Sequence, residues 1–95
     1  MKFEWDPEKA AENAAKHGIS FDQAIKAFDD PDAVFIEDLE HSEGEIREKL
    51  LGLADEAGIV LVVFTERHGD VYRIISAREA TRKEKRFYAK NEKAD

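Results

Sequence analysis

Four arginines are the residues of this sequence best suited to bind a phosphate group. Arg67, Arg73 and Arg78 lie in or next to the last strand-like segments of the chain, and Arg47 lies in an earlier one. Arginine stays charged at any physiological pH, and its planar guanidinium can grip two phosphate oxygens at once. The sequence therefore predicts a phosphate-binding set in which Arg67, Arg73 and Arg78 lead and Arg47 supports them.

Proton transfer could fall to His17 or Glu45, since histidine titrates near neutral pH and a carboxylate can accept a proton. His17 directly precedes Gly18, so a role in ending a helix is an equally open interpretation. His41 and Tyr88 are further candidates, although His41 fits a plain loop residue and His68 a turn residue.

A metal or cofactor site is not expected. The acidic residues 38–45 match neither the spacing of a calcium loop nor that of a zinc motif, and the chain has no cysteine. No glycine-rich phosphate loop and no nucleophilic serine or cysteine motif is present.

Charge is distributed very unevenly along the chain. The formal net charge is −7, but residues 1–66 carry −11 whereas residues 67–90 carry +5. Charges further apart than about 10 Å are screened at ordinary ionic strength, so a local basic surface can bind phosphate on an acidic molecule. A solvated basic helix is the alternative interpretation.

Ninety-five residues, of which 42% are hydrophobic, predict one small globular domain over residues 1–95. The longest apolar run, Ile59 to Phe64, is too short to span a bilayer, and the first residues lack the apolar core of a signal peptide. We therefore expect a cytoplasmic protein that does not engage membranes.

The first half of the sequence predicts a short strand, two helices and a strand. Asp6 and Pro7 can begin a helix that Gly18 ends, with the alanines at 10, 11, 14 and 15 facing a sheet. Ser20 and Gln23 resemble a capping box for a second helix to residue 28, and residues 33–38 are strand-like.

The second half predicts three strands and a helix. Strands are expected at residues 45–53, 59–67 and 71–76, the second of them in a central position because it is apolar on both faces. Ser76 and Glu79 resemble a capping box for a helix running to about residue 91. The order β-α-α-β-β-β-β-α, with tightly connected strands, indicates an α+β domain with a mostly antiparallel sheet.

Two features of this second half concern polar side chains. The hairpin between residues 59–67 and 71–76 should bring Arg67 and Arg73 together in either register. On the last helix Ala77, Ala80, Phe87 and Tyr88 are expected to face inward, with Glu84 among them. A carboxylate at the edge of an apolar face needs a partner, and we expect an arginine.

The sequence resembles the BrnT family over nearly its whole length, from Phe3 to Tyr88. Three segments carry the resemblance: Phe3-x-Trp5-Asp6-Pro7-x-Lys9 with Asn13, Lys16-His17-Gly18 and Phe21; His41-Ser42-Glu43-Gly44-Glu45-x-Arg47 with Gly52; and Thr65-Glu66-Arg67 with Arg73-Ile74-Ile75-Ser76-Ala77-Arg78-x-Ala80-Thr81-x-x-Glu84. The resemblance implies a RelE-like fold and a ribonuclease toxin of a type II toxin–antitoxin system that blocks translation. It also implies a BrnA antitoxin. The toxin itself would contact operator DNA only indirectly, through that antitoxin.

Cleavage of RNA without a metal needs a base for the 2′-hydroxyl, an acid for the leaving 5′-oxygen and cations for the phosphorane. For this chemistry we predict Arg67, Arg73, Arg78, His17, Glu45 and Arg47 as catalytic residues, and Lys16, Arg82 and Tyr88 as RNA contacts. Because the chain is so acidic through residue 66, two alternatives stay open. One is a catalytically weak module that binds the antitoxin, and the other is a plain nucleic-acid-binding domain.

Overall fold

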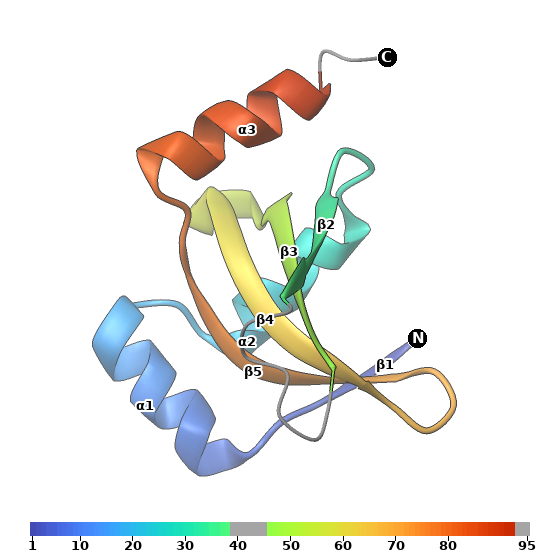
Figure 1. Ribbon diagram of the computed structural model, residues 1–95. Coiled ribbons are helices and arrows are strands. Elements are labelled where there is room, and N and C mark those ends of the chain that lie inside the picture. The colour runs from blue at the N-terminus through green and yellow to red at the C-terminus, as the bar shows by residue number, and fades with distance from the viewer. Residues whose placement is uncertain (39–45, 93–95) are drawn as a thin grey trace.

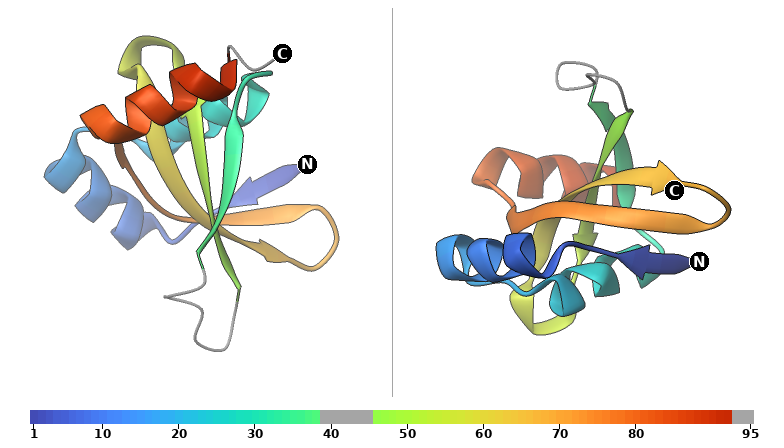
Figure 2. Two further views of the ribbon diagram at one scale, coloured as in Figure 1. Left: turned by 45° about the horizontal axis from the view of Figure 1, so that its top comes forward. Right: turned by 90° about the horizontal axis from the view of Figure 1, so that it is seen from below.

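The chain folds into one five-stranded sheet with helices on both faces (Figure 1). A computed structural model describes residues 1–38 and 46–92. The strands lie in the order β1-β5-β4-β3-β2, so β4 is central, as its apolar sequence predicts. Two turned views show α3 on one face of the sheet and α1 with α2 on the other (Figure 2).

The elements follow the predicted α+β order. The strands are β1 (Lys2–Glu4), β2 (Val34–Asp38), β3 (Arg47–Leu53), β4 (Ile59–Arg67) and β5 (Val71–Glu79), and the helices are α1 (Pro7–His17), α2 (Phe21–Ala24) and α3 (Arg82–Glu92). The described residues also form two short 3₁₀ helices, η1 (Ile25–Asp29) and η2 (Asp55–Ala57). The expected second helix is therefore α-helical only in its first turn. Within residues 1–38 and 46–92, the strand pairs are antiparallel except β1 with β5, which are parallel.

The local signals around α1 act as predicted. The Asp6 carboxylate accepts a hydrogen bond from the Glu8 amide at 2.9 Å, and Gly18 ends the helix with a φ of 72°. The expected alanine face is wrong, because three of the four alanines are exposed. Asn13 is buried instead and holds α1 against β5.

Asn13 acts as a substitute strand partner for the edge of β5. Its side-chain amide donates to the Ala77 carbonyl at 2.8 Å and accepts from the Ala77 amide at 3.0 Å. It also donates to the Ile19 carbonyl at 3.1 Å. The side chain thereby satisfies backbone groups that β1 is too short to reach.

The main core lies between the sheet and the α1–α2 side. Fully buried Phe21, Leu50, Val62 and Phe64 form its centre, and Phe28 packs edge-on against Phe64 at a centroid distance of 5.1 Å. A smaller core, made of Leu51, Leu61, Ala80 and Tyr88, lies under α3 on the opposite face.

The predicted start of the last helix is wrong. Residues from Ser76 to Glu79 continue strand β5, because they pair with β4 as far as Val60. The helix begins at Arg82, where the capping box is formed by Thr81 and Glu84. The Glu84 amide donates to the Thr81 hydroxyl at 3.1 Å, and the Thr81 amide donates to the Glu84 carboxylate at 2.8 Å. Tyr88 faces inward as predicted, whereas Phe87 is 45% exposed.

A β-bulge at Ile75 decides which side chains of β5 share a face. Val63 pairs with Ser76 and Phe64 pairs with Ile74, so Ile75 is the extra residue. In a regular strand, Arg73 and Arg78 would point to opposite faces because they are five residues apart. The bulge places both on the face that α3 partly covers.

Among residues 1–38 and 46–92, no helix has the length and apolar character needed to cross a membrane.

Candidate functional site

Most of the predicted arginines lie on one face of the sheet, which we call the α3 face. Three rows of residues cross this face in register. They are Val34, Leu51, Leu61 and Arg78 in the first row, Ile36, Lys49, Val63 and Ser76 in the second, and Asp38, Arg47, Thr65, Arg73 and Glu4 in the third. Arg67 lies beyond the third row, opposite Val71. The face therefore changes from apolar beneath α3 to cationic at the β4–β5 hairpin.

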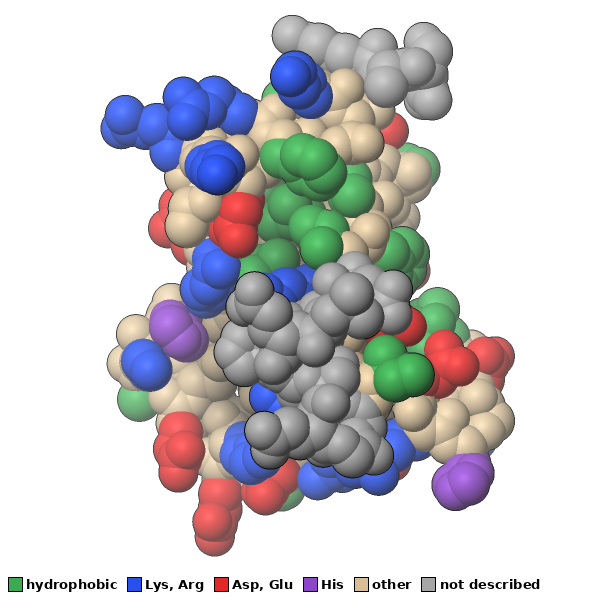
Figure 3. Space-filling model, viewed as in Figure 1, with side chains coloured by type: hydrophobic (Ala, Val, Ile, Leu, Met, Phe, Trp, Pro, Cys, Tyr) green, Lys and Arg blue, Asp and Glu red, His purple; other side chains and the backbone are tan. Residues whose placement is uncertain are grey.

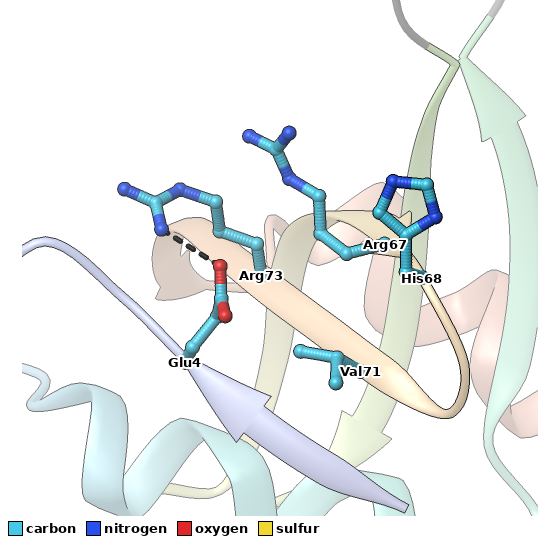
Figure 4. Close-up of a pocket in the computed structure, with 5 residues that line it drawn as sticks. All are labelled: Glu4, Arg67, His68, Val71 and Arg73. Carbon is cyan, nitrogen blue, oxygen red and sulfur yellow. Dashed lines mark hydrogen bonds and ion pairs between the residues drawn. The ribbon is translucent and has the colours of Figure 1, made fainter.

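An open groove at the hairpin end brings Arg67 and Arg73 together. It has a volume of about 570 Å³ and is lined by Glu4, Arg67, His68, Val71 and Arg73 (Figure 4). Since Thr65 pairs with Arg73, Arg67 and Arg73 are diagonal neighbours, about 7–8 Å apart at the backbone. The prediction that the hairpin unites these two arginines is confirmed.

Glu4 controls the position of Arg73 in this groove. Its carboxylate accepts a hydrogen bond from Arg73 Nη1 at 2.8 Å, and the side chains are 46% and 34% exposed, respectively. Both groups therefore remain within reach of solvent and of a ligand. An anion entering the groove would compete with Glu4 for the same guanidinium.

Arg78 is engaged at the other end of β5. Its Nη1 and Nη2 donate to the two carboxylate oxygens of Glu84 at 2.8 and 3.0 Å, and Nη1 also donates to the Glu79 carbonyl. This confirms that Glu84 has an arginine partner. The hydrogen bonds from Arg78 and from the Thr81 backbone lower the pKa of Glu84 to about 2, against the opposing effect of burial. The same pair raises the pKa of Arg78. Arg78 thus anchors α3 to β5 and does not line the groove that holds Arg67 and Arg73.

The predicted proton carriers lie elsewhere. His17 and Lys16 line a separate hollow of about 260 Å³ beside the β5 bulge, together with Asn13, Ile75 and Ser76 among others. Glu45 and His41 lie outside the described residues. Arg47 is half-buried in the third row and shares its face with Arg73.

Tyr88 and Arg82 occupy different environments on α3. Tyr88 is buried, and its hydroxyl donates to the Asp30 carboxylate at 2.5 Å. Burial would raise the pKa of Asp30, but the hydrogen bonds from Tyr88 and the backbone amides of Leu53 and Asp32 lower it. In this arrangement Tyr88 holds α3 in place, and its ring is not presented to a base. Arg82 is the exposed first residue of α3, and this helix lies at the opposite end of the domain from the β4–β5 hairpin (Figure 1).

Sequence reasoning missed three residues of this face. Glu4 reaches the groove only because β1 pairs in parallel with β5, which no local signal predicts. Lys49 joins the second row through its register with Val63. His68 lies in the hairpin turn, as predicted, and the same hairpin could have placed it next to Arg67 in the groove.

Comparison with known proteins identifies the family. The model of the ribonuclease toxin BrnT of type II toxin–antitoxin systems matches residues 5–84. The chain belongs to the BrnT family. The crystal structure of the Brucella abortus ribonuclease toxin BrnT has the same fold, with a TM-score of 0.67 and 25% sequence identity over 86% of this chain and 99% of that one. No curated protein matches the sequence.

Membership of the BrnT family makes the chain a ribonuclease toxin of a type II system, and such a toxin implies an antitoxin partner. The α3 face with its arginines is then the surface on which to seek the RNA site. Within residues 1–38 and 46–92, no group of three or more histidine and acidic side chains is arranged to hold a metal ion.

Proposed function

We propose that this BrnT-family chain is a metal-independent endoribonuclease and that Arg67 and Arg73 bind the scissile phosphate. The observation that supports the proposal is the open groove in which the two guanidinium groups share one face of the β4–β5 hairpin. The third row extends this cationic surface through Arg47.

The proposed reaction uses the RNA itself as the nucleophile. The 2′-oxygen attacks the neighbouring phosphorus and loses its proton, while the bond from phosphorus to the 5′-oxygen breaks and that oxygen gains a proton. Negative charge grows on the phosphorane oxygens during this step, and two fixed guanidinium groups stabilise it. Because arginine cannot give up its proton, other groups must move the protons.

Glu4 and His68 are the groove residues that can carry protons. Glu4 lies next to the phosphate site through its bond to Arg73, and His68 follows Arg67 at the exposed hairpin turn. Of the earlier candidates, His17 fits less well because it lines a different hollow, and Glu45 lies outside the described residues.

The remaining parts of the proposal follow from the family. We infer that the toxin cleaves RNA needed for translation and thereby inhibits protein synthesis in the cytoplasm. We also infer that a BrnA-type antitoxin neutralises the toxin. Operator DNA would be reached only through that antitoxin.

A cleavage assay in EDTA tests the proposal. Arg67→Ala and Arg73→Ala should each reduce cleavage at least tenfold, because losing one transition-state contact commonly costs about 100- to 1000-fold in rate. Arg86→Ala is the matched control and should cleave RNA like wild type, because Arg86 is an exposed residue of α3. Helix α3 lies at the opposite end of the domain from the β4–β5 hairpin (Figure 1). Loss of cleavage by wild type in EDTA would disprove metal independence, and full activity of Arg73→Ala would disprove the phosphate-binding assignment.

The contact between Glu4 and Arg73 favours a second candidate, a toxin whose nuclease is weak because a carboxylate occupies its phosphate-binding arginine. Glu4→Gln separates the two. If Glu4 is a proton acceptor, the variant should cleave RNA more slowly than wild type. If Glu4 only blocks Arg73, the variant should cleave faster than wild type.

A further inference from the structure

The α3 face combines an apolar part with a cationic part, and the two are continuous. Beneath α3, Val34, Ile36 and Val63 are each only partly buried. Figure 3 shows hydrophobic side chains gathered directly below α3, with lysine and arginine side chains further along the same face. Arg73 and Arg67 lie at the cationic end.

Phe87 adds an exposed aromatic ring to the apolar part. It directly precedes the buried Tyr88, so it lies on the flank of α3, beside the sheet rather than over it. At 45% exposure it is a large hydrophobic side chain without full cover in the domain. We call Val34, Ile36, Val63 and Phe87 the apolar strip. Basic side chains border it, because Lys49 lies between Ile36 and Val63 in the second row, and Phe87 shares a hollow on α3 with Lys83, Arg86 and Lys90.

RNA binding explains the cationic part of this face but not its apolar part. Single-stranded RNA is held by cations and by aromatic rings that stack on bases, and it gains little from branched aliphatic side chains. Such side chains next to a cationic surface fit a protein segment that carries both apolar and acidic residues. Residues 67–90, with a net charge of +5 in a chain of −7, are where such an acidic segment would be attracted.

We propose that the antitoxin covers the α3 face with one continuous segment, whose apolar residues pack on the apolar strip and whose Asp or Glu residues bind Arg67 and Arg73. Leu61 in the first row and Arg67 are six residues apart on β4, which is about 20 Å. About six extended residues cover that distance. The segment inhibits by direct competition, since it binds the arginines that RNA needs. This inference rests on the proposed function, because both use Arg67 and Arg73.

Phe87→Ser provides the decisive variant, because the exposed ring can be removed with little effect on the core. We expect Phe87→Ser to bind the cognate antitoxin at least about tenfold more weakly than wild type. The cognate antitoxin is the protein that relieves the effect of this toxin when the two are co-expressed. RNA cleavage by Phe87→Ser should be unchanged. Phe35→Ser is the matched control, because Phe35 is 58% exposed and lies on the opposite face of β2. This variant should bind the antitoxin like wild type.

Salt dependence tests the acidic half of the segment. Antitoxin association with wild type should slow markedly between about 50 and 300 mM salt, and Arg73→Ala should reduce this dependence. Wild-type affinity in Phe87→Ser, a larger loss in Phe35→Ser, or a salt-independent association rate would overturn the inference. A parallel loss of RNA cleavage in Phe87→Ser would assign the strip to RNA instead. Failure of wild type to cleave RNA would refute the proposed function alone, because antitoxin binding is measured separately.

Discussion

Replacing Glu84 by glutamine should destabilise the domain by an amount that depends on pH. Glutamine keeps the size of the side chain and can still complete the capping box with Thr81, so the change removes mainly the charge. The substitution removes the negative charge that accepts two hydrogen bonds from the Arg78 guanidinium, from Nη1 to Oε1 at 2.8 Å and from Nη2 to Oε2 at 3.0 Å. That contact joins α3 to the end of β5.

The size of the effect follows from the pKa of Glu84. Each pKa unit corresponds to about 1.4 kcal/mol, so a lowering from 4.5 to about 2 sets an upper bound of about 3 kcal/mol. The Glu84 and Arg78 side chains are 26% and 36% exposed. Solvent screening at that exposure reduces the expected loss to about 1–2 kcal/mol. Because the folded-state pKa lies below the unfolded one, this stability is present above about pH 4.5 and is lost as the pH falls towards 2.

Urea unfolding followed by the fluorescence of the single tryptophan, Trp5, measures the effect. The difference in unfolding free energy between wild type and Glu84→Gln should be largest near pH 7 and should vanish near pH 2. Glu79→Gln is the control, because its pair with Lys85 is a surface contact with side chains 67% and 44% exposed, worth less than about 0.5 kcal/mol. Equal stability of wild type and Glu84→Gln at pH 7, or a difference that persists unchanged to pH 2, would refute the reasoning.

Two further variants test the packing that positions the α3 face. Asn13→Ala should lower the unfolding free energy by about 2–3 kcal/mol, because it leaves the buried Ala77 amide and carbonyl without their partner, and faster amide exchange at Ala77 would locate the damage. Gly52→Ala should lower the free energy of unfolding by about 1–3 kcal/mol in a urea titration, because an added Cβ would lie 2.8 Å from the Ala27 backbone oxygen. If the variant is as stable as wild type, η1 can move away from the added methyl group without cost.

The candidate site was predictable only where its residues are close in sequence. Arg67 and Arg73 flank one short turn, so any hairpin register unites them. Glu4 is 69 residues from Arg73, and only the parallel pairing of β1 with β5 brings its carboxylate to the guanidinium. The partner of Glu84 was predictable as an arginine from the cost of burying a lone carboxylate, although the sequence does not specify Arg78.

Local hydrogen bonds explain what the sequence determined by itself. The Asp6 cap, the left-handed Gly18 and the Ser20 cap each depend on residues within a few positions, so the beginnings of α1 and α2 and the end of α1 could be read from the chain. The order of elements along the chain and the central position of β4 likewise followed from apolar runs and tight turns.

Only the tertiary structure decided between two competing patterns at the end of the chain. Ser76 with Glu79 and Thr81 with Glu84 both resemble capping boxes, and the first lost because continued pairing with β4 keeps those residues in a strand. The bulge at Ile75 then placed Arg73 and Arg78 on the same face, against the alternation that a regular strand would impose. Pairing and bulges depend on contacts with a neighbouring strand, and that neighbour is not encoded in any short window of sequence.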